Sequence, residues 1–456
     1  MASKKILVLL GSDRLAYPLL KYLAAQGKAY GWQIRIGCMF DSQLAERIKS
    51  EKVSEEFSFV NFTKIQECEQ AIKKSDIVIG FMADNLLLQV ADSCIKFRKA
   101  LISPGRLNRQ MAIRKPLAQE NEVLILMDCG VSPGLDHITA KKAIDNIHLR
   151  GGEISSFKTY SGSFVDKSTT LNPWGFKFAE PAGDVLSWGR HNNRHIIDGQ
   201  LQHIPYHQLF ERSRRIDIRD QRDLVSIPEG DSLYYRKIYG LTDAHTVLKS
   251  KLANNGMDRL FNLLIQLGLT DMHSRIDLGT EGSFYKLLES LLPVSSGKSL
   301  EEKLRDYTGA SFEEVEKLRW LGLFDDSWIE GVREITAATA LQVLMEDKFP
   351  PLGEDPDRVV MEHHLAYEFR DELFEFSATL IMEGEDQKDS AAARITGYIC
   401  GAAAKAVLLG SIKLRGLHIP VLKEIYDPIL NELEELGVAF HVNDTKIQAA
   451  AADQPV

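Results

Sequence analysis

A glycine-containing turn near the start of the chain has residue types that could bind a nucleotide. The apolar run ILVLL (residues 6–10) leads into GSDRLA (11–16), and a helical pattern of apolar residues follows. A strand, a glycine turn and a helix in this order hold a dinucleotide pyrophosphate, because backbone N–H groups and the helix dipole face the phosphates. The sequence therefore predicts cofactor contacts at Gly11, Ser12, Asp13, Arg14 and Leu15.

Asp13 stands where such a turn usually has its second glycine. A carboxylate about 4 Å from a phosphate costs about 4 kcal/mol at an effective dielectric constant of about 20, so dinucleotide binding would be weakened. Arg14 beside it would offset part of this repulsion. In the alternative interpretation, Asp13 is the N-cap of the following helix, a role that aspartate fills well.

The elements that would position this turn follow from the pattern of residues 1 to about 130. Strands are expected at 6–10, 33–40, 57–62, 76–82, 99–103 and 122–130, with helices at 15–27, 41–50, 65–75, 87–97 and 108–119 between them. Short apolar runs separated by helices are typical of a parallel sheet with crossover helices. The sequence predicts an α/β fold that begins with a doubly wound dinucleotide-binding (Rossmann) domain.

The later part of the chain has other patterns. The pairs Ser299/Glu302 and Ser311/Glu314 have capping-box spacing within a helical region. Residues 358–382 are expected to form a β-hairpin that turns near 370–372, with the neighbours His363 and His364 on opposite faces, so no metal site is predicted. Residues 391–410 read as a buried helix of small residues, because charges interrupt them too often for a membrane span.

The composition limits the class of protein. The chain has 456 residues, enough for two or three domains, with 44% hydrophobic and 26% charged residues. The formal net charge is -9 without a long basic run, which argues against nucleic acid or an anionic membrane as partner. Five scattered cysteines without a C-x-x-C pair predict reduced thiols in a cytoplasmic protein.

Six sequence blocks give a more specific interpretation. They are CGVSPGLDHITAKKAID (129–145), GGEISSFKTYSGS (151–163), NPWGFKF (172–178), GDSLYYRKIYGL (230–241), WLGLF (320–324) and EIYDPILNELEELGV (424–438). With these blocks the chain resembles the saccharopine dehydrogenase family, in particular its glutamate-forming branch, also called saccharopine reductase. The resemblance runs in order over nearly the whole chain.

The resemblance implies three structural parts and a homodimer. The Rossmann domain would comprise residues 1–135 plus about 388–415, and an α/β substrate and dimerisation domain 136–245 plus about 345–387 and 416–448. A helical insertion would occupy 246–344, and a frayed tail 449–456. The family's enzymes oxidise the secondary amine of saccharopine with NAD(P)+, and the imine is hydrolysed to glutamate and aminoadipate semialdehyde. The reverse reaction serves lysine synthesis.

The resemblance also locates the part of the cofactor that carries the adenosine. Asp41 follows the second strand, where the family reads the ribose, and it could accept hydrogen bonds from the ribose diol. No arginine stands there for a 2′-phosphate, so NAD is favoured over NADP. Alternatively, Asp41 is the N-cap of the next helix. Asn61, after the third strand, takes the place of a family aspartate near the adenine.

The substrate positions depart from the family pattern. The motif L-D-P-G-I-D-H reads VSPGLDH at 131–137, S-S-Y reads SPG at 103–105, and S-Y-C-G-G reads TYSGS at 159–163. His137 is the best retained titratable group, although it is alternatively a structural histidine in the first helical turn. The predicted catalytic residues are His137, Ser132 and Ser161, and the predicted substrate-binding residues are Ser103, Gly134, Lys177, Asp231 and Lys251.

Arginines that would meet substrate carboxylates are missing. The family's N-R-D-S reads EGDS at 229–232 and R-G-T-L-R reads KSKLA at 249–253. Each charged hydrogen bond contributes about 1.5–3 kcal/mol, so saccharopine itself would bind weakly. The leading prediction is an NAD(P)-dependent oxidoreductase that acts on an amino-acid-derived secondary amine or imine. The alternatives are a non-catalytic paralogue, kept as a dimeric binding or assembly protein, and an imine reductase of polyamine synthesis.

Overall fold

The computed structural model divides the chain into two units. Unit 1 combines Met1–Ile154 with Tyr367–Val456, and unit 2 is Ser155–Ala366. The structure describes residues 4–10, 16–38, 58–61, 65–165, 172–190, 193–279, 282–328, 332–349, 356–385 and 389–447.

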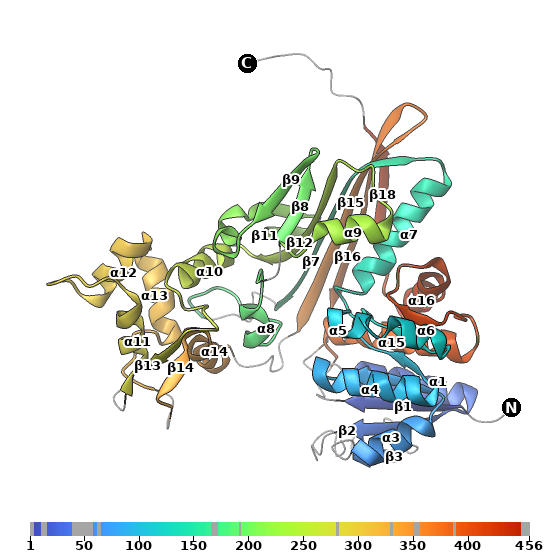
Figure 1. Cartoon of the computed structure of the whole chain (residues 1–456). Helices are drawn as coiled ribbons and strands as arrows, with labels where there is room; N and C mark the ends of the chain where they lie inside the picture. The colour runs from blue at the N-terminus through green and yellow to red at the C-terminus, as the bar shows by residue number, and fades with distance from the viewer. Residues whose placement is uncertain are drawn as a thin grey trace. The chain divides into compact units, whose positions relative to one another are not determined.

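Unit 1 contains a parallel sheet of seven strands (Figure 1). The strands are β1 (Lys5–Leu10), β2 (Gln33–Cys38), β3 (Ser58–Asn61), β4 (Ile77–Phe81), β5 (Ala100–Ile102), β6 (Leu124–Leu126) and β17 (Gly416–His418). Their order is β17-β6-β5-β4-β1-β2-β3, and every pairing is parallel. The strand order reverses between β1 and β4, so the predicted doubly wound Rossmann topology is confirmed.

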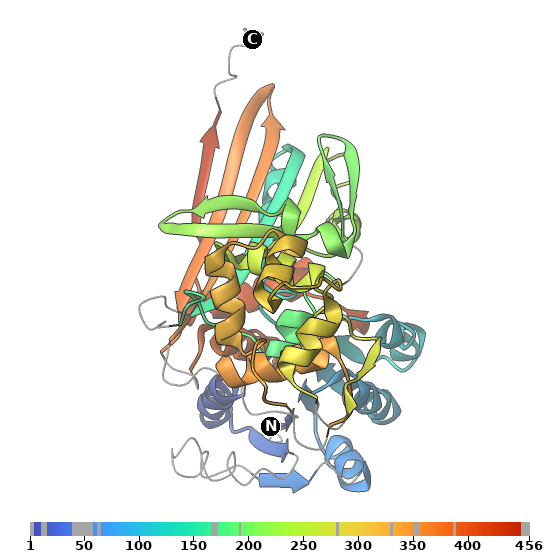
Figure 2. The same cartoon turned by 90° about the vertical axis from the view of Figure 1, so that its left-hand side faces the viewer.

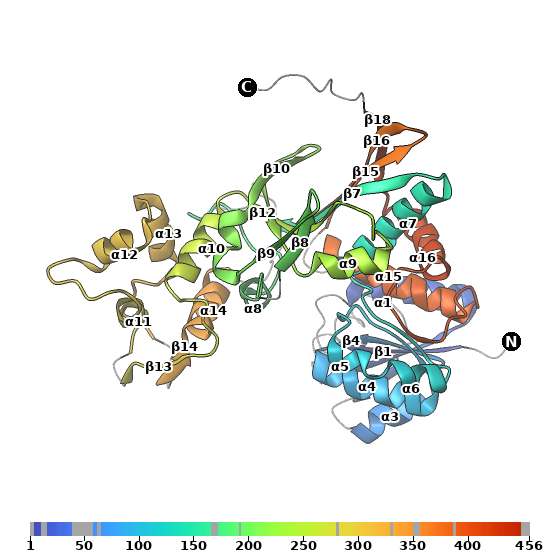
Figure 3. The same cartoon turned by 45° about the horizontal axis from the view of Figure 1, so that its top comes forward.

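Unit 1 also contains α-helices among its described residues. They are α1 (Tyr17–Tyr30), α3 (Ile65–Lys73), α4 (Asp84–Phe97), α5 (Arg109–Ala112), α6 (Lys115–Glu120), α7 (Leu135–Leu149), α15 (Ala391–Leu408) and α16 (Lys423–Glu435). Figures 1 and 3 show α15 beside α1 and α16. A Cβ atom on Gly397 would lie 2.7 Å from the Leu19 backbone nitrogen, and one on Gly401 would lie 2.4 Å from the Tyr22 ring. The small residues of α15 therefore allow close packing on α1, which confirms the predicted buried helix.

The described helices include none that is long and apolar enough to cross a lipid bilayer.

The position of β17 differs from the prediction. The sequence placed residues 416–448 with the substrate domain, whereas the structure pairs β17 with β6 of the parallel sheet. The sequence could not show this pairing, because a strand of three residues is too short for its pattern of apolar residues to indicate the sheet to which it belongs.

The last strands of unit 1 form a hairpin tip and an antiparallel pair. Strand β15 (Asp357–Phe369) ends in this unit, β16 (Glu372–Glu383) follows, and β18 (His441–Lys446) pairs with β16. Arg370 and Asp371 between β15 and β16 both have positive φ, as two-residue hairpin loops require. This turn lies where the sequence predicted it.

Unit 2 contains a second sheet with the strand order β10-β11-β12-β7-β15. Its strands are β7 (Glu153–Val165), β10 (Arg214–Ile218), β11 (Gln221–Pro228), β12 (Thr246–Asn254) and most of β15, and a hairpin of β8 (Asn193–Ile197) and β9 (Gln200–Ile204) joins at β12. Figure 3 shows this hairpin beside β12. The sequence assigned residue 246 onward to a helical insertion, whereas residues 246–254 form β12. Both faces of β12 are largely buried, so its composition lacks the alternation that marks an exposed strand.

The helices of unit 2 surround an aromatic core. They are α8 (Ala182–Leu186), α9 (Ser232–Tyr239), α10 (Met257–Gln266), α11 (Phe284–Leu291), α12 (Leu300–Thr308), α13 (Phe312–Leu321) and α14 (Ala337–Lys348), with the 3-10 turns η2 (Tyr206–Gln208) and η3 (Phe210–Arg212) and the short strands β13 (Arg275–Asp277) and β14 (Glu334–Thr336). Figure 2 shows α11–α13 in yellow in front of the sheet strands. Trp174, Phe178, Phe261 and Phe349 belong to the core. Both predicted capping boxes are present, at the starts of α12 and α13.

The two adjacent histidines of β15 face opposite sides, as predicted. The side chain of His363 is fully buried and its Nδ1 lies 2.9 Å from the Thr159 hydroxyl, whereas 41% of the His364 side chain is exposed. His364 contacts Glu362 at 2.5 Å. The described residues hold no group of three or more His, Cys, Asp or Glu side chains arranged for a metal ion.

Candidate functional site

The carboxyl ends of β1 and β4 mark the place where doubly wound sheets bind dinucleotides. Gly11, Ser12, Asp13, Arg14, Leu15 and Asp41 lie outside the described residues. Helix α1 begins at Tyr17 with Ala16 at its N-cap position and without a side-chain cap, so it starts later than capping by Asp13 would require. Asn61 is the last residue of β3 and therefore lies at the carboxyl edge of the sheet. The predicted cofactor contacts therefore stay a prediction, and the described strand order places the switch point at this edge of the sheet.

Ser103 connects the carboxyl ends of two strands at this edge. Its buried hydroxyl donates to the Gly80 carbonyl at the end of β4 (2.7 Å) and accepts from the Gly105 backbone N–H (3.0 Å). Backbone bonds from Asp128 to Gly105 (3.0 Å) and from Cys129 to Ser103 (3.1 Å) attach the segment after β6. Ser103 therefore positions the two loops rather than presenting a free hydroxyl.

The segment 128–137 after β6 folds around one carboxylate. Asp136 accepts hydrogen bonds from the Gly134 N–H (2.7 Å), the His137 N–H (2.9 Å) and the Ser132 hydroxyl (2.8 Å). Gly134 has a φ of 147°, and a Cβ atom there would lie 2.0 Å from the Gly130 carbonyl oxygen. The peptide bond between Ser132 and Pro133 is cis. Only glycine fits at position 134, and the carboxylate holds the segment in one shape.

His137 lies under this segment, on the first turn of α7. Its Nε2 is 3.5 Å from the Asp128 carboxylate, and only 1% of its side chain is exposed. Asp128 in turn accepts a hydrogen bond from the Leu107 N–H at 2.6 Å. The carboxylate orients the imidazole, and this burial favours the interpretation of His137 as a structural or positioning residue. Ser132 is partly exposed, whereas His137 is buried.

The other predicted substrate residues lie in unit 2. Lys251 of β12 is directly opposite Ser161 of β7, so the two side chains share one face of the sheet. The Lys251 ammonium lies 2.8 Å from the Glu180 carboxylate and 4.0 Å from the centre of the Trp188 ring. Lys177, together with Glu180 and Trp188, lines a small cavity of about 10 Å³. The positive charge of Lys251 is thus already paired within the unit.

Asp231 has a local role at the start of α9. Its carboxylate caps the helix by accepting from the Leu233 N–H at 3.1 Å, and it pairs with the Arg194 guanidinium. Arg194 in turn binds the Gly230 carbonyl through its backbone N–H at 3.0 Å. These contacts account for the aspartate without a substrate.

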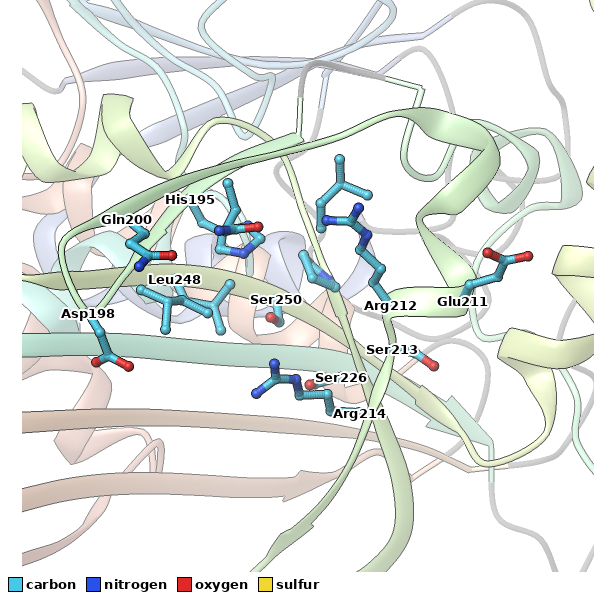
Figure 4. Close-up of a pocket in the computed structure, with 14 residues that line it drawn as sticks. His195, Asp198, Gln200, Glu211, Arg212, Ser213, Arg214, Ser226, Leu248 and Ser250 are labelled. Atoms are coloured by element: carbon cyan, nitrogen blue, oxygen red, sulfur yellow. The ribbon is translucent and has the colours of Figure 1, made fainter.

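Sequence reasoning missed a polar cavity of about 520 Å³ in unit 2 (Figure 4). Three basic side chains line it: His195 of β8, Arg212 of η3 and Arg214 of β10. Burial, and after it the two nearby guanidinium groups, lower the pKa of His195. The run RSRR at 212–215 is the one sequence signal for this cavity, because it concentrates positive charge in an acidic chain.

Comparisons with known proteins agree with this architecture. The saccharopine dehydrogenase C-terminal domain family matches residues 130–438. The chain is 26% identical over 447 residues to the saccharopine dehydrogenase [NADP(+), L-glutamate-forming] of Saccharomyces cerevisiae, covering 94% of this chain and 97% of that protein. It is 25% identical over 453 residues to the mitochondrial alpha-aminoadipic semialdehyde synthase of Mus musculus. The match covers 98% of this chain but only 48% of that protein.

Solved structures show the same fold. The apo saccharopine dehydrogenase (L-Glu forming) from Saccharomyces cerevisiae superposes with a TM-score of 0.84 at 23% identity, over 97% of this chain and 100% of that one. A homospermidine synthase from Legionella pneumophila in complex with NAD superposes with a TM-score of 0.54 at 10% identity, over 100% of this chain and 94% of that one.

Proposed function

Because the chain belongs to the saccharopine dehydrogenase family, we propose that it is an NAD(P)-dependent oxidoreductase of lysine metabolism that acts on an amino-acid-derived secondary amine or imine. One observation carries the proposal. The loops that hold Ser103 and residues 128–137 lie at the carboxyl ends of β5 and β6, on the sheet edge that carries the dinucleotide switch point. Substrate groups at this edge would face a cofactor bound between β1 and β4.

When bound at this edge, a nicotinamide dinucleotide supplies the hydride acceptor or donor. The residues of this chain orient the substrate. The Ser132 hydroxyl donates a hydrogen bond to Asp136, so its oxygen is free to accept a hydrogen bond from the substrate amine. Asp136 and Asp128 hold Ser132 and His137 in place before the substrate arrives. We expect Ser132 to position the amine, and His137 to support the loop.

The substrate differs from saccharopine in the number of carboxylates that it presents. Lys251 is neutralised by Glu180, and the family's arginines at 230 and 249–253 are replaced, which leaves fewer cations to meet a tricarboxylate. A substrate with fewer carboxylates fits the described charges better. A homodimer, a cytoplasmic location and a preference for NAD remain part of this proposal, and the yeast relative's name specifies NADP(+).

Cofactor titration tests the proposal directly. Isothermal titration of the full chain with NAD+, NADH, NADP+ and NADPH is expected to give saturable binding of at least one, with a higher melting temperature in its presence. Saccharopine and other N-substituted amino acids are then offered with the bound cofactor, and nicotinamide absorbance is followed. A diamine with an aldehyde acid serves as the polyamine-type control.

The same titration decides between catalysis and the non-catalytic alternative, which the comparisons do not support. No binding of any of the four dinucleotides at millimolar concentration would overturn the oxidoreductase proposal. Binding without turnover of any amine or imine would overturn the substrate class and leave the cofactor assignment standing.

A further inference from the structure

The 520 Å³ cavity of unit 2 lies on the face of the sheet away from Lys251. In the β11–β12 ladder, Pro228 is directly opposite Ser250, and both line the cavity. Side chains alternate between faces along a strand, so Lys251 and its neighbour Ser161 point to the other side. The cavity is therefore separate from the predicted substrate residues of this unit.

Two guanidinium groups and a histidine ring are among the side chains that line this cavity. Arg212 and Arg214 are exposed at its mouth, and the buried ring of His195 lines its wall. Arg212 bonds the Gln208 side chain at 2.9 Å, but neither guanidinium forms an ion pair with a carboxylate among the described residues. The acidic side chains that line the cavity, Asp198 and Glu211, lie at its two ends in Figure 4.

The floor of the cavity contains a hydroxyl without a partner. Ser250 is 1% exposed, and its Oγ is buried without a hydrogen-bond partner in the structure. Buried hydroxyls are almost always hydrogen-bonded, so this one requires an explanation. Figure 4 shows Ser250 and Ser226 among His195, Arg212 and Arg214. A ligand oxygen placed there would satisfy the hydroxyl and meet the arginines at the same time.

We propose that this cavity is a binding site for a small organic anion, held through a carboxylate or phosphate group. Arg212 and Arg214 would bind the oxyanion with charge-assisted hydrogen bonds, and the Ser250 hydroxyl would donate a hydrogen bond to the same group. Gln200 and Gln202 of β9 offer amide groups for the remainder of the molecule. The volume lies within the usual range for small-molecule sites, about 300–1,000 Å³.

Binding by the full chain is tested with two probes, glutarate and inorganic phosphate, with sodium chloride at matched ionic strength as the reference. We expect saturable binding of one or both, which also identifies the kind of oxyanion. R212Q and R214Q should each weaken it about tenfold, or about 1.4 kcal/mol.

Arg215 provides the matched control for these variants. It follows Arg214 on β10 but faces the other side, opposite Val225 rather than Ser226. R215Q removes the same charge and should leave binding unchanged. Equal losses in R214Q and R215Q, or no saturable binding of either probe, would overturn the proposal.

Ser250→Ala separates a ligand-binding role from a structural one. Because its hydroxyl has no protein partner, removal should leave the melting temperature unchanged or slightly higher while weakening oxyanion binding several-fold. A lower melting temperature with intact binding would contradict the proposal. Dinucleotide binding by the same variants should be unchanged. Failure of the anion-site proposal would therefore be distinguishable from failure of the oxidoreductase proposal.

Discussion

Two polar regions of the molecule differ in how their side chains are satisfied. In the segment 128–137 of unit 1, one carboxylate accepts three hydrogen bonds and another orients a histidine. In the unit 2 cavity, a buried serine hydroxyl has no partner and two arginines have no acidic partner among the described residues. The first region is arranged in advance of any ligand. The second has bonding capacity left, which a ligand would use.

The largest expected effect comes from the glycine that allows the first region to fold. Gly134→Ala would place a Cβ atom 2.0 Å from the Gly130 carbonyl oxygen, at a φ of 147° that alanine cannot adopt. Because both obstacles are backbone, we expect a loss of at least about 4 kcal/mol of unfolding free energy, measured by urea denaturation.

Gly151→Ala is the control for that glycine. Gly151 also lies in unit 1 with a positive φ, of 86°, but its added Cβ would meet no atom within 4 Å. Only backbone strain remains, so the expected loss is about 1 kcal/mol. Equal losses in the two variants would show that the close approach to Gly130 is unimportant.

A smaller loss is expected when the shared carboxylate is removed. Asp136→Ala leaves the buried N–H groups of Gly134 and His137 without acceptors, which should cost about 3 kcal/mol. Asp136→Asn keeps one acceptor oxygen and should lose less than half as much. If the alanine and asparagine variants unfold at the same urea concentration, the hydrogen bonds do not hold this segment.

The pair Lys251–Glu180 is intermediate between the two regions, because it is satisfied but partly exposed. The two side chains are 17% and 30% exposed. Lys251→Met leaves the Glu180 carboxylate beside Trp188 without its cation, so we expect a loss of about 1 kcal/mol. The double variant with Glu180→Gln should recover part of it. A double-mutant cycle that gives no coupling energy would show that the ion pair between Lys251 and Glu180 does not stabilise the fold.

Glu314 lies outside the candidate site, but its carboxylate is also held by hydrogen bonds. Of the residues considered so far, its replacement has the smallest expected effect. Burial acts to raise its pKa, but hydrogen bonds from the Ser311 backbone and the Arg259 side chain outweigh burial and hold the pKa below its usual range. Its ionised form therefore stabilises the fold above the unfolded-state pKa, and the contribution is lost as the pH falls through the lower folded-state pKa.

Glu314→Gln should accordingly reduce the unfolding free energy by about 0.5 kcal/mol at pH 7 and by less near pH 3. The measurement is urea denaturation at several pH values. Glu302→Gln, in the exposed capping box of α12, is the matched comparison, and its effect should be smaller. A difference that does not change with pH would assign the effect to packing.

The sequence was sufficient for β1 to β6 of the Rossmann sheet, because each of these strands is a short apolar run that a helical pattern separates from the next. Both capping boxes and the hairpin turn at Arg370 and Asp371 were also predictable, since their signals are local. Strands β12 and β17 were misassigned because their burial depends on partners that are distant in the sequence.

The candidate site was less predictable than the fold. Ser103 and Asp231 were predicted to bind substrate because they align with the family motifs S-S-Y and N-R-D-S. Only the structure shows that both side chains form local hydrogen bonds. The cavity with Arg212 and Arg214 was missed because it forms between a hairpin and a sheet face, which no spacing along the chain encodes.

Close packing between α1 and α15 has a consequence for biosynthesis. The glycines of α15 fit directly against Leu19 and Tyr22, and β17 completes the edge beside β6, yet these partners are separated in the chain by all of unit 2. A ribosome therefore produces α1 before unit 2, and α15 only after unit 2. Until α15 emerges, Leu19 and Tyr22 of α1 lack this packing partner, so we expect a chaperone to bind this face of α1 and shield it from aggregation.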